Sequence, residues 1–139
     1  MCGRFALKTP TSELASHFKL DEAVEVDPRY NIAPGTDIPT IRHSPEDKRV
    51  MHLLRWGLVP HWAKDPSIGN KLSNARGETV AEKPSFRDAF KRRRCLVPAD
   101  GFYEWKAEGK QKQPYYFSMK DGEPFALGGV WESWRAPNG

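Results

Sequence analysis

This chain has few residues that could bind a metal or form a disulfide: two cysteines and four histidines among 139 residues. Cys2 and Cys95 form no disulfide framework, although a single bridge between them stays open. Neither the cysteines nor the histidines show the spacing of a zinc site, so we expect no metal. No apolar run is long enough to span a membrane, so we expect no membrane partner.

Length and net charge indicate the number of domains but say little about what the protein binds. The chain is long enough for one domain, and we expect a single domain over residues 1–139. A net charge of +4 favours an anionic partner weakly, because many basic proteins bind none. Nucleic-acid binding is therefore compatible with the composition but is not required by it.

Local patterns predict a mixture of helices and strands. Thr11 or Ser12 can cap a helix over 10–20, and Ser85 can cap a second helix over 83–94. Apolar runs and alternation predict strands over the segments 4–8, 38–43, 49–60, 95–105 (with an internal turn), 114–120 and 125–134.

The connections are predicted from proline, glycine and the lack of a period. Residues 26–39 read as a loop, and residues 60–83 as a long irregular segment of the kind that carries function. Hairpin turns are predicted at 109–112 and at 120–124, and a bulge or bend at Gly128-Gly129. We therefore predict an α+β fold, rich in strand, with a barrel-like, mostly antiparallel curved sheet flanked by short helices.

Cys2 is the first candidate for chemistry, because removal of Met1 would leave it at the N-terminus. Its α-amine, with an ordinary pKa of about 7.7–8.0, would be partly neutral and nucleophilic near pH 7. The amine can attack an aldehyde, and the neighbouring thiol can then close a thiazolidine ring. Alternatively, Cys2 is simply the second residue and carries no function.

Two further motifs carry polar groups that suit a reaction site. In "NARGET", Asn74, Arg76 and Glu78 alternate and would share a face of an extended segment, but the residue types alone favour a solvated loop or strand edge. In "PADGFYEW", Glu104 lies among aromatic residues, where it either faces solvent or is partly buried with a raised pKa. The buried case would suit a general acid or base.

Cations and aromatic rings offer the means to bind single strands. Arg87 and the residues 91–94 make the second predicted helix strongly basic. Trp56 and Trp105 are expected in the core, whereas Trp62, beside the irregular segment, is the better surface candidate. The alternative is that the charges only solvate the end of a helix.

Five motifs, taken in order, resemble the SRAP family, the SOS response-associated peptidases. They are "MCGRF", "RYNIAPG", "WGLVPHW", "NARGET" and "RCLVPADGFYEWK". The resemblance implies a β-rich α+β fold that binds single-stranded DNA and single/double-strand junctions and forms a covalent crosslink with abasic sites, in the DNA damage and SOS responses. It also implies a proposed thiol autopeptidase activity, no cofactor, and a location in the cytoplasm at the nucleoid of a bacterium or in the nucleus of a eukaryote.

The resemblance also assigns roles to single residues. Cys2 matches the family's catalytic cysteine, Asn74 the asparagine that positions the reacting groups, and Glu104 the acid that assists proton transfer. The positions implied to contact DNA, together with two cations of the basic segment, are Arg4, Pro34, Trp62, Arg76, Lys83 and Arg87.

One family feature is missing. The family's catalytic histidine lies in a later motif, and none of the four histidines here has a matching context. We therefore expect the chain to be an N-terminal part of the domain, truncated at its C-terminus. Two alternatives to crosslinking follow: an N-terminal-cysteine thiol peptidase and a non-catalytic single-stranded DNA-binding module.

Overall fold

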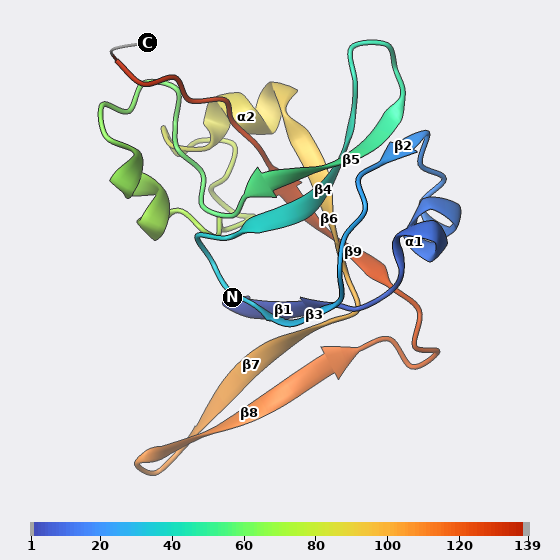
Figure 1. The fold of residues 1–139 in the computed structure, drawn as a ribbon. Coiled ribbons are helices and arrows are strands. Elements are labelled where there is room, and N and C mark those ends of the chain that lie inside the picture. The colour runs from blue at the N-terminus through green and yellow to red at the C-terminus, as the bar shows by residue number, and fades with distance from the viewer. Residues whose placement is uncertain (1, 138–139) are drawn as a thin grey trace.

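The computed structural model describes residues 2–137, and its strands far outnumber its helices (Figure 1). In chain order the elements are β1 (Arg4–Leu7), α1 (Thr11–His17), β2 (Glu22–Ala23), β3 (Arg29–Ile32), β4 (Asp37–His43), β5 (Arg49–Arg55), the 3₁₀ helix η1 (Pro66–Lys71), α2 (Arg87–Arg92), β6 (Arg94–Ala99), β7 (Gly101–Glu108), β8 (Gln111–Ser118) and β9 (Phe125–Val130).

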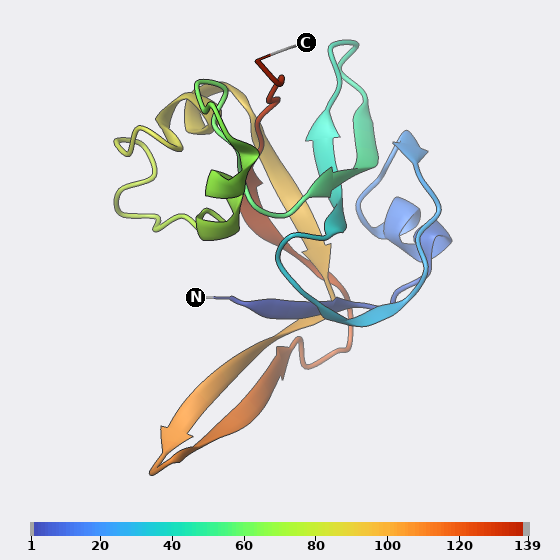
Figure 2. The ribbon, with the colours of Figure 1, turned by 60° about the vertical axis from the view of Figure 1, so that its left-hand side comes forward.

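The strands form two sheets, with the orders β3-β1-β7-β8 and β2-β5-β4-β6-β9. Every pairing is antiparallel except that of the short β2 with β5. The predicted α+β, mostly antiparallel fold is confirmed, with the strands divided between two sheets that do not close. The β7–β8 hairpin projects from the rest of the molecule in both views (Figures 1 and 2). Within residues 2–137, the helices are too short and too polar to cross a membrane.

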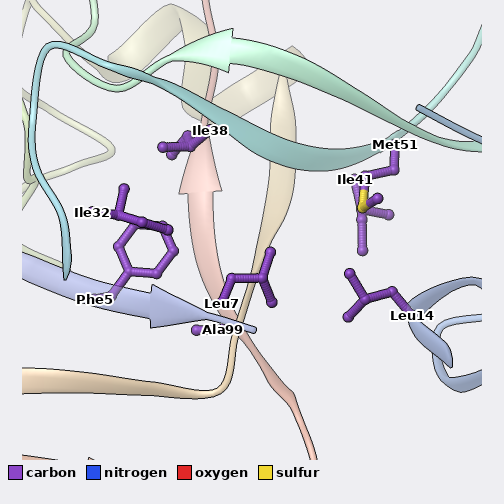
Figure 3. Close-up of a cluster of buried hydrophobic side chains, with 8 residues drawn as sticks. All are labelled: Phe5, Leu7, Leu14, Ile32, Ile38, Ile41, Met51 and Ala99. Atoms are coloured by element: carbon purple, nitrogen blue, oxygen red, sulfur yellow. The ribbon is translucent and has the colours of Figure 1, made fainter. Parts of the chain in front are cut away.

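The core lies between the two sheets and is closed on one side by α1. Figure 3 shows its buried side chains, which are Phe5, Leu7, Leu14, Ile32, Ile38, Ile41, Met51 and Ala99. Full burial of one large apolar side chain contributes about 1.5–3 kcal/mol. Because β1 supplies both Phe5 and Leu7, this short strand is fixed firmly although it has only four residues.

The predicted helix caps are wrong. The N-cap of α1 is Pro10, and the buried Thr11 instead accepts a hydrogen bond from the backbone N–H of Val26 at 3.0 Å. The Thr11 hydroxyl is thus used in a tertiary hydrogen bond instead of capping the helix. The helix α2 begins only after Phe86, without any side-chain cap from Ser85.

Three predicted connections differ from the structure. Residues 26–39 include the strand β3, because Ile32 pairs with Phe5. Residues 120–124 do not form a hairpin, because β8 and β9 belong to different sheets. Gly128 and Gly129 pair with β6 in unbroken register, so the predicted bulge is absent from this pairing. Residues 60–83 contain no α-helix or strand, in agreement with the predicted irregular segment, although the 3₁₀ helix η1 lies within them.

Asp100 joins the two sheets where the chain passes from β6 to β7. Its buried carboxylate accepts hydrogen bonds from the backbone N–H groups of Lys8 and Thr9, at 2.6 and 2.9 Å, and from the Thr9 hydroxyl at 2.6 Å. Its own N–H donates to the carbonyl of Ala6 at 2.8 Å. Asp100 therefore ties the end of β1 to the corner between the sheets.

Replacing Asp100 tests this tie. We expect Asp100→Ala to lower the free energy of unfolding by about 2–4 kcal/mol, because two partly buried N–H groups and the Thr9 hydroxyl lose a charged acceptor. Asp100→Asn, which keeps one acceptor oxygen, should lose clearly less. Urea unfolding followed by circular dichroism measures both, and equal losses in the two variants would contradict the assigned role.

Candidate functional site at the start of β1

Cys2 lies two residues before β1, next to the strand that carries Glu104. Antiparallel pairing places Arg4 opposite Tyr103 and Phe5 opposite Phe102. The Cys2 side chain is half-buried against the core, and its thiol donates to the carbonyl of Arg4 at 3.4 Å. Pairing of β1 with β7 thus brings the two predicted catalytic groups of these strands into one region.

Asn74 reaches the same place from a segment 72 residues away in sequence. Its side-chain Nδ2 donates a hydrogen bond to the backbone carbonyl of Cys2 at 2.7 Å. The Asn74 segment is itself held in place, because the indole N–H of Trp56 donates to the carbonyl of Ser73 at 2.7 Å. The structure therefore brings Asn74 and Cys2 together.

A close backbone contact between Gly57 and Gly69 fixes the irregular segment that leads to Asn74. Gly57 has a φ of +129°, and a Cβ at this position would lie 2.6 Å from the carbonyl oxygen of Gly69. Only glycine fits such an approach without a shift of the backbone. Next to it, the N–H of Leu58 donates to the carbonyl of Leu72 at 3.0 Å. The two ends of this segment are thereby joined just before Asn74.

The surroundings of the Cys2 thiol raise its pKa, which favours the neutral form. Burial raises its pKa above the ordinary value, the carboxylate of Glu104 raises it further, and a backbone hydrogen bond with Arg4 offsets only part of the rise. Cys95 is buried, and burial raises the pKa of its thiol to about 11. Both cysteines are free thiols, so the bridge between them that the sequence left open is not formed.

A largely apolar cavity of about 700 Å³ adjoins this site. Among the sequence-predicted site residues, Cys2 and Asn74 line it, and Trp56, Phe86 and Trp134 contribute to its walls. Glu104 is half-buried and lies outside the lining, where its charge still reaches the Cys2 thiol. The cavity is large enough for a small organic group brought to Cys2.

The residues predicted to contact DNA lie outside this cavity. Arg4 donates to the side-chain oxygen of Asn31 at 3.1 Å. Trp62 is 51% exposed, which agrees with its predicted place at the surface, whereas the expectation that Trp105 is buried in the core is wrong, since 45% of it is exposed. The other predicted contacts are exposed on loops or at the start of α2: Pro34, Arg76, Lys83 and Arg87.

Sequence reasoning missed a polar cluster around Glu132, beside Trp62. The nearly buried carboxylate of Glu132 contacts Arg93 at 3.0 Å and His61 at 3.4 Å. The indole N–H of Trp134 donates to the carbonyl of Ala63 at 2.7 Å. Both residues that flank Trp62 are thus tied to the segment after β9. An acidic residue between two tryptophans, in "WESW", was the available signal.

The effect of Glu104 on Cys2 can be tested by thiol alkylation. We expect Glu104→Gln to lower the pKa of the Cys2 thiol, because the neutral amide removes a negative charge that opposes the thiolate. The alkylation rate with iodoacetamide, measured against pH in a Cys95→Ser background, should therefore rise at lower pH.

Glu108→Gln is the matched control, because Glu108 lies on the same strand, closer to the hairpin turn. Its pH profile should coincide with that of the parent. A Glu104→Gln profile that also coincides with the parent would contradict the electrostatic link.

Comparison with known proteins agrees with the motifs. The family model described as SOS response associated peptidase (SRAP) matches residues 1–139. The relative named "Abasic site processing protein YoqW", from Bacillus subtilis (strain 168), is 44% identical over 143 residues, which cover 100% of this chain and 63% of the relative. "Abasic site processing protein YedK", from Escherichia coli (strain K12), is 35% identical over 138 residues, which cover 94% of this chain and 59% of the relative.

Solved structures show the same fold. A crystal structure of a protein from Bacteroides thetaiotaomicron superposes with a TM-score of 0.84 at 28% identity, covering 97% of this chain and 62% of that one. The chain thus spans about 60% of the length of the relatives described here. Because the family model matches along the whole chain, the resemblance seen in its motifs is confirmed: the chain belongs to the SOS response associated peptidase (SRAP) family.

Proposed function

We propose that this protein captures abasic sites in single-stranded DNA, as a crosslink through an N-terminal Cys2, in the response to DNA damage. The observation that carries the proposal is the 2.7 Å hydrogen bond from Asn74 to the carbonyl of Cys2, which holds the second residue at the wall of the cavity. The relatives named abasic site processing proteins support the choice of DNA lesion. This chemistry requires the removal of Met1, which lies outside the residues that the structure describes.

In the first chemical step, the α-amine of Cys2 is the nucleophile. An abasic sugar in its ring-opened form presents an aldehyde, and the neutral α-amine of Cys2 adds to the aldehyde carbon. Loss of water then leaves an iminium ion. Asn74 holds the carbonyl of the same residue, so it limits the directions in which the amine can point.

In the second step, the thiol of Cys2 is the nucleophile. The sulfur of Cys2 adds to the iminium carbon and closes a five-membered thiazolidine ring, while the thiol gives up its proton. Because the thiol is neutral, the step needs a proton acceptor, and the nearby carboxylate of Glu104 suits this role. The overall change joins aldehyde, amine and thiol with the loss of one water, and it needs no cofactor or redox partner.

DNA binding in this proposal uses the exposed cations and Trp62. Arg4 and Arg76 lie close in sequence to Cys2 and Asn74, and can hold the phosphates beside the reacting sugar. Pro34, Lys83 and Arg87 would contact the strand further away, at a single strand or a single/double-strand junction. The protein would act where DNA is, in the bacterial cytoplasm or in a eukaryotic nucleus.

A denaturing gel tests the proposal. Wild-type protein incubated with an abasic single-stranded oligonucleotide should give a shifted band, and Cys2→Ala should give none. Cys95→Ser should keep the band, because the Cys95 thiol is buried and stays protonated. The intact mass should equal protein lacking Met1 plus DNA minus one water.

Asn74→Ala should slow crosslinking by up to roughly 100-fold, because a misplaced reacting group costs about that much in rate. Salt-sensitive binding without any covalent product would select the non-catalytic DNA-binding module instead. Cysteine-dependent cleavage of peptides without a DNA adduct would select the thiol peptidase, which the raised pKa of the Cys2 thiol disfavours because a peptidase attacks with the thiolate.

A further inference from the structure

A short segment after β9 contacts the turn that carries Trp62. It comprises residues 131–134, with the sequence "WESW", and we call it the WESW segment. The last pair between β6 and β9 joins Arg94 to Val130, and the backbone N–H of Trp131 then donates to the carbonyl of Arg93 at 2.8 Å. The WESW segment therefore starts from a position that the sheet fixes.

The carboxylate of Glu132 is the centre of the first set of contacts. Only 6% of its side chain is exposed, and its Oε1 accepts a hydrogen bond from the N–H of Ser133 at 3.0 Å. Its Oε2 accepts from Arg93 at 3.0 Å and lies 3.4 Å from Nδ1 of His61. A buried carboxylate is costly unless it is paired and hydrogen-bonded. A conformation in which these partners leave Glu132 is therefore disfavoured, and His61 is held next to Trp62.

Trp134 makes the second contact, on the other side of Trp62. Its indole N–H donates to the carbonyl of Ala63 at 2.7 Å, and the N–H of Ala63 donates to the carbonyl of Pro60 at 3.0 Å. Ala63 and Pro60 are buried, whereas Trp62 between them is 51% exposed. The WESW segment thus contacts both neighbours of Trp62 and leaves the ring of Trp62 at the surface.

We propose that Glu132 and Trp134 are positioning residues that hold the exposed ring of Trp62 ready to stack on an unpaired base. A ring that is already fixed loses little conformational freedom on binding, so more of its stacking energy contributes to affinity. Both residues act through the neighbours of Trp62 and need no contact with the nucleic acid. The proposal deepens the proposed function and rests on it for the kind of ligand.

Two conservative substitutions weaken these contacts with little change in volume. Trp134→Phe removes the N–H that donates to Ala63 and keeps an aromatic ring, and Glu132→Gln removes the negative charge but keeps the size of the side chain. We call their combination the double variant. Trp131→Phe is the matched control, because it makes the same change in the same segment at a ring that packs under the guanidinium of Arg42, 4.9 Å from the ring centroid.

The experiment measures the affinity for a fluorescent oligothymidylate without abasic sites, by anisotropy, in two backgrounds. With Trp62 present, the double variant should bind about 5-fold more weakly than wild type, because a stacked base contributes at least that much to affinity. In a Trp62→Ala background the same two substitutions should change the affinity by less than about 2-fold, since the ring on which they act is gone. The control Trp131→Phe should stay within about 2-fold of its parent in both backgrounds.

Substitutions that only loosen the fold would weaken binding equally in both backgrounds, and that result would overturn the proposal. An unchanged affinity of the double variant with Trp62 present, or of Trp62→Ala itself, would overturn it as well. If the double variant unfolds by circular dichroism, Trp134→Phe alone is carried through the same comparison, with the same expected pattern and the same contradicting outcomes.

Hydrogen exchange of the DNA-free protein gives a second readout. The amide of Ala63 should exchange faster in the double variant than in wild type, because the carbonyl of the same residue loses its indole donor and the turn opens more often. Trp131→Phe should leave this exchange rate unchanged. An unchanged rate in the double variant would show that the WESW segment does not hold the turn, and would overturn the proposal.

The abasic crosslinking gel run in parallel separates the two proposals. Crosslinking by wild type together with equal losses of affinity in the two backgrounds overturns the positioning role alone. A loss of affinity that depends on Trp62, in a protein that forms no crosslink, overturns the proposed capture chemistry alone.

Discussion

The antiparallel pairing of β1 with β7 is the constraint on which the site depends. The four residues of β1 lie between β3 and β7, in the middle of their sheet. Their alternation sends Phe5 into the core and Arg4 to the outer face, and their position leaves Cys2 just beyond the paired region. A slip of one residue would exchange these faces, because side chains alternate with a period of two. Burial of Phe5 and Leu7 makes such a slip costly, so core packing also fixes where Cys2 lies.

A second constraint brings Asn74 to Cys2 across a long irregular segment. Ordering such a segment costs conformational entropy, and one hydrogen bond at about 0.5–1.5 kcal/mol does not offset that cost. Several contacts together offset this entropy cost. They are the close approach of Gly57 to Gly69, the hydrogen bond from the Trp56 indole to the carbonyl of Ser73, and the hydrogen bond from the N–H of Leu58 to the carbonyl of Leu72. These contacts support the segment before Asn74, which explains how an irregular segment can hold the Asn74 side chain against the carbonyl of Cys2.

Sequence patterns predicted the strands whose signal is local. They failed where residues far away in the sequence determine a strand pairing or a hydrogen-bond partner. The strands β1, β4 and β9 were predicted because their apolar residues follow one another or alternate. The strand β3 was missed because the prolines and glycine around Tyr30 read as a loop, while its pairing with β1 is a tertiary event. Thr11 was assigned to a cap because its type suits one, yet Val26 uses its hydroxyl.

The same distinction applies to the site. Cys2, Asn74 and Glu104 were found as residue types within motifs, but the hydrogen bond between the first two spans 72 residues and has no local signal. Trp105 was placed in the core because large rings usually bury, whereas the β7–β8 hairpin projects from the molecule and leaves it half exposed (Figure 1). Whether a ring is buried depends on what covers its sheet, and this is a property of topology that composition does not contain.

The neutral thiol has a consequence for the order of bond formation at Cys2. Enzymes that attack through sulfur lower the pKa of the thiol with nearby cations, whereas burial and Glu104 raise it here. A protonated thiol is a poor first nucleophile, so the α-amine is the better group to meet an aldehyde. In the proposed capture, the positive charge of the iminium would attract both the sulfur and the carboxylate, and the proton would leave as the ring closes. A group that would impair a thiol peptidase is therefore well placed in a site where the thiol acts second.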